Sequence, residues 1–239
     1  MSDAVAVALH ELVLANRIMA REGIIDDFGH VSVRHPHDPE RYFLSYSRSP
    51  ELVTRDDIME FTLEGEAIDR RGRAIYRERV IHGALYQARP DVNAVVHHHT
   101  PEILPFTITD LKLRPASHLA ATIGTEVPLW DSQDEFGDTN MLVETIDQGE
   151  SLARAQGLNP CVLLRGHGAN CAAHNLRAVV FIAIAMRDNA QLLLRSLPFG
   201  EPIYLSPGEI SRTAATQLED APLQRSWDYR IARAGFRGI

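Results

Sequence analysis

The sequence predicts a single domain of mixed α and β structure. Its 239 residues suffice to bury roughly 70% of the unfolded chain's surface in one core, so no disulfide or other staple is required. Long segments with apolar residues three and four positions apart alternate with short apolar runs, the pattern of helices mixed with strands. No internal repeat, low-complexity tract or linker divides residues 1–239, so we expect one domain.

Helical periodicity, capping residues and terminating glycines or prolines mark the expected helices. Asp3 is a suitable N-cap for the first of them, and Gly23 ends it. A capping box marks the start of segment 53–61, a Thr-Pro start marks that of 100–108, and segment 206–218 is also capped. The expected helices are residues 3–21, 53–61, 78–88, 100–108, 140–155, 176–197 and 206–218.

Alternating or continuous apolar runs bounded by turn residues predict the strands. Two of them, 30–35 and 42–46, flank the turn HPHDPER and so predict an antiparallel hairpin. Further strands are expected at 63–68, in the run NAVVHHH and in CVLLRGHG. The basic, aromatic tail at 220–239 has little periodicity, and we expect it at a subunit interface.

Charge and cysteine content limit the partners to be expected. With 24 basic and 32 acidic residues, a net charge of -8 argues against nucleic acid or an anionic membrane as the main partner. No window reaches the ~18 consecutive apolar residues of a membrane span, and no secretion signal is apparent. Cys161 and Cys171 lack a C-x-x-C spacing, so they are expected to be reduced thiols in the cytoplasm.

Three consecutive histidines at the end of an apolar run suggest a metal site. In a strand, His97 and His99 project to one face and lie about 7 Å apart at their bases, while His98 projects to the other. Two imidazoles so placed can converge on one ion, although hydrogen-bonded polar residues at a strand end fit the triplet equally well.

Two further segments favour the metal interpretation. His167 follows the strand CVLLR and is flanked by glycines, which permit close approach of a ligand to the backbone. Glu78 and His82 stand four residues apart on one helix face, and that helix leads into the histidine-bearing strand. A carboxylate near two or three histidines can act as a metal ligand, a general base or both.

The run Y-R-E-R-x-I-H-G-A-L-Y-Q-A-R-P-D-V-N-A-V-V-H-H-H, followed later by L-L-R-G-H-G-A-N, resembles the class II aldolase/adducin family. The likeness extends from the first helix to about residue 197. It implies a three-layer fold in which helices flank a central, mostly antiparallel sheet, and a homotetramer with active sites at subunit boundaries. It also implies a divalent metal on Glu78, His97, His99 and His167.

The resemblance also bears on the substrate. The family's sugar-phosphate aldolases hold phosphate with small or hydroxyl residues at three places. The corresponding pairs here are Gly29–His30, Ser47–Arg48 and Tyr76–Arg77. The planar forks of Arg48 and Arg77 match carboxylates, so we expect a small, flat, carboxylated substrate rather than a sugar phosphate. Ion pairing alone would be the alternative role of these arginines, and a turn position that of His30.

With G-H-V-S, Y-R-E-R-x-I-H-G and D-E-F-G-D-T-N-M-L-V, the chain is similar to a branch of metal-dependent decarboxylases of hydroxylated aromatic or pyridine dicarboxylic acids. The resemblance implies loss of CO2 while a metal stabilises the negative charge as an enolate or phenolate. Glu78 would be a ligand or handle protons, and His118 or His30 would be the general acid. We expect Mn ahead of Zn, and then Fe or Co.

Several alternatives remain open from the sequence. The nearest is a metal-dependent aldolase acting on a hydroxy or keto acid. An Fe(II) oxygenase also fits, and a non-catalytic, adducin-like module fits less well because all four proposed ligands are kept. Trp227 and Tyr229 could close a neighbouring subunit's site or pack ordinarily at an interface.

Overall fold

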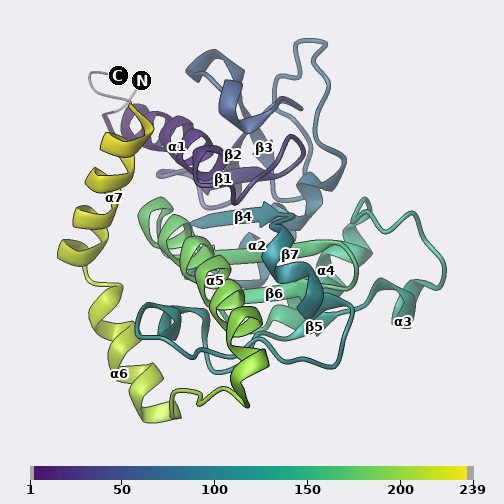
Figure 1. Ribbon diagram of the computed structural model, residues 1–239. Coiled ribbons are helices and arrows are strands. Elements are labelled where there is room, and N and C mark those ends of the chain that lie inside the picture. The colour runs from purple at the N-terminus through teal and green to yellow at the C-terminus, as the bar shows by residue number, and fades with distance from the viewer. Residues whose placement is uncertain (1–2, 236–239) are drawn as a thin grey trace.

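The computed structural model describes residues 3–235, and a seven-stranded sheet forms its centre. The strands are β1 (His30–Arg34), β2 (Arg41–Ser45), β3 (Ile58–Thr62), β4 (Ala94–His98), β5 (Leu129–Trp130), β6 (Cys161–Leu164) and β7 (Gly168–Ala173). Their order is β3-β2-β1-β4-β7-β6-β5, and all neighbours are antiparallel except β5 and β6 (Figure 1). The mostly antiparallel sheet confirms the predicted fold class.

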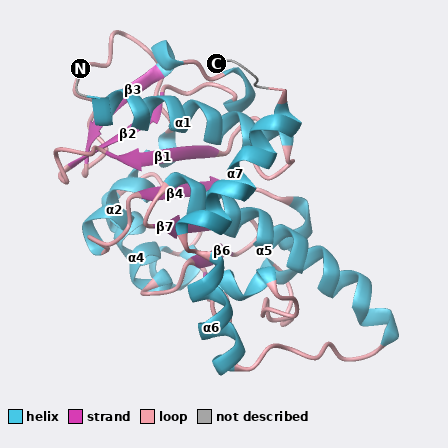
Figure 2. Cartoon of the chain, turned by 90° about the vertical axis from the view of Figure 1, so that its left-hand side faces the viewer, coloured by secondary structure: helices cyan, strands magenta, loops and turns pink. Residues whose placement is uncertain are grey.

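Helices cover both faces of this sheet. They are α1 (Asp3–Arg21), α2 (Val80–Ala88), α3 (Ser132–Phe136), α4 (Ile146–Gln156), α5 (Leu176–Ser196), α6 (Pro207–Gln217) and α7 (Asp220–Ala234). Figure 2 shows α2 and α4 on the opposite side of the sheet from α5 and α7. Alternation along β4 serves both layers, because Val96 packs in the core with α1 and α5 while Val95 packs with α2 and α4.

Three of the expected helices differ from the structure. Segment 53–61 contains only a 3₁₀ turn, Arg55–Asp57, before β3 begins, because β3 pairs with β2 along its whole length. Segment 100–108 is a 3₁₀ helix, Pro101–Thr107, with Pro105 inside it, and proline lacks the N–H that an α-helix needs. Helix α4 begins at Ile146 rather than 140, because Thr145 and Gln148 form a capping box there.

Other elements escaped the sequence patterns. The strand β7 consists of small and polar residues, GANCAA, which carry little strand propensity but pair with both β4 and β6. The expected strand at 63–68 is a turn with a single bridge between Phe61 and Ala67. Within the described part of the chain, no helix is long and apolar enough to cross a membrane.

The C-terminal stretch forms a helix that packs on its own chain. In α7, Leu223 and Trp227 are buried in the core shared with α1 and α5. Trp227 is therefore committed to this chain's interior, whereas Tyr229 remains 54% exposed. The expected role of 220–239 at a subunit interface stays a prediction, and its last four residues, 236–239, lie outside the described range.

We predict that Gly83→Ala destabilises the protein by at least roughly 1–3 kcal/mol, the usual cost of overpacking. A Cβ at Gly83 in α2 would lie 1.8 Å from the carbonyl oxygen of Leu63, so helix or loop must move. Gly208→Ala in α6 is the matched control, because a Cβ there has open space around it. Thermal unfolding curves measure both, and equal midpoints for the two variants would contradict this packing.

Candidate active site

Four side chains converge at one end of the central strands. The Nε2 atom of His99 lies 3.0 Å from that of His97 and 3.1 Å from that of His167. The Oε2 atom of Glu78 lies 3.6 Å from His97 Nε2 and 3.7 Å from His167 Nε2. One ligand atom from each residue can be chosen so that all four lie within 4.8 Å of one another. The structure thus assembles the four residues that the sequence nominated as metal ligands.

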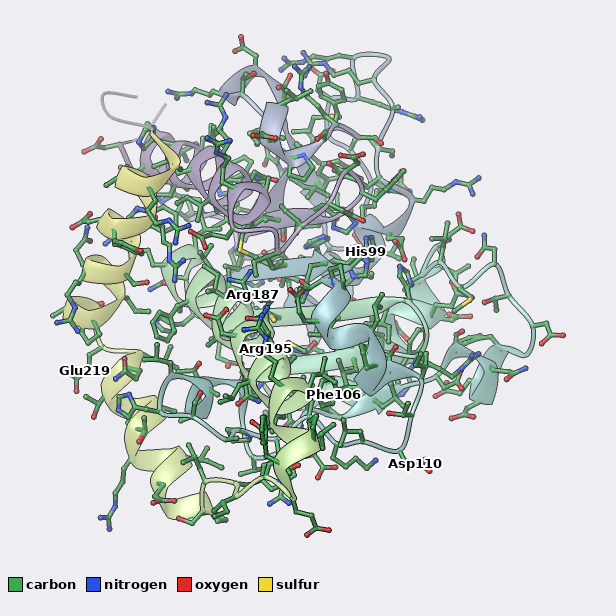
Figure 3. The ribbon with its side chains drawn as sticks, in the orientation of Figure 1. His99, Phe106, Asp110, Arg187, Arg195 and Glu219 are labelled. Carbon is green, nitrogen blue, oxygen red and sulfur yellow. The ribbon has the colours of Figure 1, made fainter. Side chains whose placement is uncertain are left out.

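The strand pairing explains this convergence. His97 lies in β4 and His99 follows its last residue, so alternation directs both rings to the face where Val95 packs with α2. Figure 3 labels His99 near the central sheet. Antiparallel pairing of β4 with β7 sets His98 opposite Ala169, which places His167 beside the end of β4. Gly168 makes this possible, because a Cβ there would lie 2.3 Å from the His98 carbonyl oxygen.

Each of the three rings is oriented by an oxygen at its Nδ1 atom. These oxygens are Asn170 Oδ1 for His97 at 2.7 Å, both carboxylate oxygens of Asp26 for His99 at 3.1 Å, and the Met141 carbonyl oxygen for His167 at 2.9 Å. Since these oxygens accept, each Nδ1 carries the proton and each Nε2 presents a lone pair. Three lone pairs and a carboxylate facing one another repel unless a cation lies between them, so this donor set fits a divalent metal.

Burial controls the charge of the cluster. It raises the pKa of Glu78 to about 7, and the nearby charge of Glu144 adds to this, while a hydrogen bond from the Val143 amide opposes it. Burial also lowers the pKa of His167 to about 4 and holds that of His97 well below its usual range, with the neighbouring imidazoles adding to both effects. Neutral rings are the form that binds metals.

A cavity of about 620 Å³ opens onto the cluster. Its lining residues are Phe28, His30, Ser47, Ile75, Tyr76, Arg77, Glu78, His99, Met141, Leu142, Gly166 and His167. Four of them, Phe28, Ile75, Met141 and Leu142, give it apolar walls. At the rim, the Arg77 side chain is 71% exposed, and its guanidinium pairs with Glu144 at 3.0 Å.

Arg48, an expected substrate-binding residue, and His118, an expected general acid, do not line this cavity. Arg48 is held elsewhere, with Nε 3.0 Å from the Leu52 carbonyl oxygen and 3.4 Å from Asp57 Oδ2, and Nη1 2.6 Å from the Tyr46 hydroxyl. His118 is exposed at the start of a 3₁₀ helix and is absent from the lining of this chain's cavity. Within one chain, neither residue is placed to touch a substrate.

Gly29, an expected substrate-binding residue, packs closely against neighbouring backbone and side chains. A Cβ there would lie 2.8 Å from Ile25 and 3.0 Å from the His97 carbonyl oxygen, so glycine allows β1 to approach β4 closely. Its amide donates to Asp26 Oδ1 at 2.9 Å, and thereby holds the carboxylate that orients His99. Gly29 supports the metal cluster and is not part of the cavity lining.

The sequence did not single out the residues that orient the ligands. Asp26 carried a weak signal, because an aspartate three residues before a glycine commonly caps a turn. Met141 and Val143 lie in D-E-F-G-D-T-N-M-L-V, a segment that supports the resemblance but does not by itself predict a ligand-orienting role. Met141 has a φ of 66°, a left-handed conformation that its residue type does not reveal. Asn170 lies in β7, which had no strand signal.

The fold and the ligand cluster define a protein of the class II aldolase type. Residues 10–194 match the Class II Aldolase and Adducin N-terminal domain, and the chain belongs to this family. It is 28% identical to decarboxylase tropJ of Talaromyces stipitatus, covering 98% of this chain and 96% of that protein. It is 27% identical to 3,4-dihydroxyphthalate decarboxylase of Arthrobacter keyseri, with 95% and 94% covered. The structure of L-fuculose 1-phosphate aldolase from Glaciozyma antarctica PI12 shares the fold, with a TM-score of 0.80, 21% identity, and 97% and 91% covered.

We predict that His97→Ala abolishes metal retention while His98→Ala preserves it. His98 faces the other side of β4, where its Nδ1 pairs with the Thr100 hydroxyl at 2.7 Å, so its loss should lower the melting temperature only. Elemental analysis of both variants, purified from metal-replete medium, gives the stoichiometry. Equal metal content in the two proteins would refute the assigned ligand set.

We also predict that metal affinity rises with pH up to about 7. The metal binds the carboxylate form of Glu78, whose pKa in the metal-free protein is about 7, so below that pH the metal displaces a proton. Below this pKa, displacing the proton weakens metal binding by about tenfold for each pH unit. Above it, Glu78 is already ionised and the metal affinity no longer depends on its protonation. Competition titrations with a chelator measure the slope. Glu78→Gln should lower it by one proton, and an unchanged slope would contradict the prediction.

Proposed function

We propose that the chain is a divalent-metal-dependent decarboxylase of a hydroxylated aromatic or heteroaromatic carboxylic acid. The observation that carries the proposal is an apolar-walled cavity that opens directly onto the Glu78–histidine cluster. Family membership supports carbon–carbon lyase chemistry, and the two similar decarboxylases, each matched over nearly its whole length, support loss of CO2.

The walls favour a flat ring over a sugar phosphate. Phe28, Ile75, Met141 and Leu142 offer no partners for sugar hydroxyls, and an unpaired buried hydroxyl costs roughly 1–3 kcal/mol. An aromatic ring loses little on leaving water and gains contact with these side chains. The volume of about 620 Å³ is ample for one substituted ring.

The residues around the cavity divide the remaining tasks. A divalent metal held by Glu78, His97, His99 and His167 would supply positive charge that stabilises the electron pair left by carbon–carbon cleavage. Arg77 would bind a substrate carboxylate by exchanging it for Glu144. The Val143 amide holds Glu78 Oε1 at 2.9 Å and leaves Oε2 directed at the histidines. The apolar walls keep water from the reacting ring.

A metal-dependent aldolase acting on a hydroxy or keto acid is the second candidate. The same cluster would stabilise the carbanion of an aldol cleavage, and only the leaving group differs. Ser47 in the cavity lining offers a hydroxyl that such a substrate could use, whereas the Tyr76 hydroxyl is bonded to the Arg48 backbone carbonyl. Presence of the complete ligand set favours either lyase over a non-catalytic module.

We extend the proposal to the identity of the metal and to the oligomeric state. Three imidazoles and a carboxylate suit Mn, Zn, Fe or Co, and oxygen-rich chelation by the substrate favours Mn first. We further propose a homotetramer with active sites at subunit boundaries. Phe28, which is 73% exposed at the cavity rim, supports this, because a neighbouring subunit would bury it.

The direct test incubates metal-loaded protein with hydroxylated aromatic and pyridine dicarboxylates, including 3,4-dihydroxyphthalate, and measures CO2. The expected result is CO2 release that depends on the added metal. Release of pyruvate or an aldehyde without CO2 would establish the aldolase instead. Elemental analysis of the purified protein identifies the metal.

We predict that Arg77→Ala raises the KM for a dicarboxylate by about tenfold while metal content stays constant, since one charge-assisted hydrogen bond is lost. Arg154→Ala is the matched control. Arg154 also pairs with a glutamate, Glu135, at 2.9 Å on the surface, but it lies outside the cavity lining. Steady-state kinetics compare the variants, and an equal KM in both would remove Arg77 from the binding site.

A further inference from the structure

Four buried side chains form a hydrogen-bonded chain that leads away from the cavity. His30 lines the cavity, and its Nδ1 lies 2.6 Å from His82 Nε2 on α2. The other ring nitrogen of His82, Nδ1, lies 2.7 Å from Ser32 Oγ, which lies 2.7 Å from the Tyr86 hydroxyl. All four residues are at most 1% exposed. The metal ligands take no part in these bonds.

Tyr86, at the end of this hydrogen-bonded series far from the cavity, determines which atom donates in each bond. Among the described residues, Ser32 Oγ is the side-chain acceptor within hydrogen-bonding distance of the Tyr86 hydroxyl. A buried phenol O–H without an acceptor is strongly disfavoured, so Tyr86 donates to Ser32. Ser32 then has His82 Nδ1 as the acceptor for its own proton.

The same reasoning continues to the cavity. Because His82 Nδ1 accepts, the neutral His82 ring carries its proton on Nε2 and donates it to His30 Nδ1. Burial lowers the pKa of His82 to about 3, so its ring is neutral near pH 7 and carries a single proton. A His30 Nδ1 that accepts this bond is unprotonated, which leaves the proton of the His30 ring on Nε2. In the opposite direction the chain would end on an unpaired Tyr86 O–H.

We infer that His30 carries its proton on Nε2 and presents this N–H to the cavity as a neutral donor for an anionic substrate oxygen. Among the described residues, the side-chain hydrogen bond of the His30 ring is made by Nδ1, and His30 lines the cavity. His82, Ser32 and Tyr86 are positioning residues that hold this tautomer. The binding role rests on the proposed function, whereas the tautomer follows from the protein alone.

The hydrogen-bonded series orients His30, but it is unsuited to replace a proton that His30 gives up. If His30 gave its proton to a substrate carbon, replacement along the chain would leave a tyrosinate at Tyr86. Burial raises the pKa of Tyr86, so that outcome is unfavourable. The proton therefore stays on His30, and the substrate's carbon takes its proton from another source.

Nitrogen NMR of the zinc-loaded, ¹⁵N-labelled full chain at pH 7 tests the tautomer. Long-range ¹H–¹⁵N correlations distinguish a protonated from an unprotonated ring nitrogen, and His30→Gln and His82→Gln spectra assign the signals. We expect protonated Nε2 and bare Nδ1 in both rings. Protonation of His30 at Nδ1, or at both nitrogens, would overturn the inference whether or not the protein proves to be a decarboxylase.

Addition of phthalate, an aromatic dicarboxylate without ring hydroxyls, tests the donor role separately from catalysis. The His30 Nε2–H signal should move on binding, because a hydrogen bond to a carboxylate deshields the proton. Phthalate binding that leaves this signal in place would refute the donor role.

Ser32→Ala tests the positioning residues. Without the serine donor, His82 is no longer fixed, and His30 should show both neutral tautomers. If the proposed decarboxylation holds, kcat/KM should fall by about tenfold with unchanged metal content. Ser151→Ala is the matched control. The buried Ser151 hydroxyl bonds to Trp130 and Glu135 and is not part of the hydrogen-bonded series from His30 to Tyr86. A single Nε2–H signal of His30 in Ser32→Ala would show that the chain does not select the tautomer.

Discussion

The pairing of β4 with β7 is the constraint on which the site depends. It places the residue before β7, His167, beside the end of β4, where His97 and His99 project from one face. The close contact at Gly168 requires glycine, and the register admits no slip, because a shift by one residue would turn β4's imidazoles toward α5. The strand register that forms the sheet therefore also fixes the positions of the metal ligands.

The sequence predicted the parts of this arrangement that have a local signal. Apolar periodicity located α1, α2, α5 and β4, and strand alternation separated His98 from its two neighbours. Spacing and resemblance together nominated Glu78 and His167 as ligands. On the opposite face, His98 is fully buried and hydrogen-bonded, so it contributes to stability rather than to the metal cluster.

The parts that escaped prediction depend on contacts between distant segments. Arg48 looked like a carboxylate ligand, yet the local fold gives its guanidinium to Asp57, Tyr46 and a carbonyl oxygen. Asp26 and Asn170 orient the ligands from other elements, and no spacing rule links them to the histidines. The partners of Ser32 and Tyr86 likewise follow only from the packing of α2 on the sheet.

The loop after α3 contributes both to metal binding and to the wall of the substrate cavity. The Met141 carbonyl and the Val143 amide hold His167 and Glu78, while the side chains of Met141 and Leu142 form cavity walls. By thermodynamic linkage, a substrate that favours the ligand-holding form of this loop tightens metal binding, and the metal tightens substrate binding by the same factor. Evolutionary selection for a new substrate at these walls would therefore also change the metal affinity of the protein.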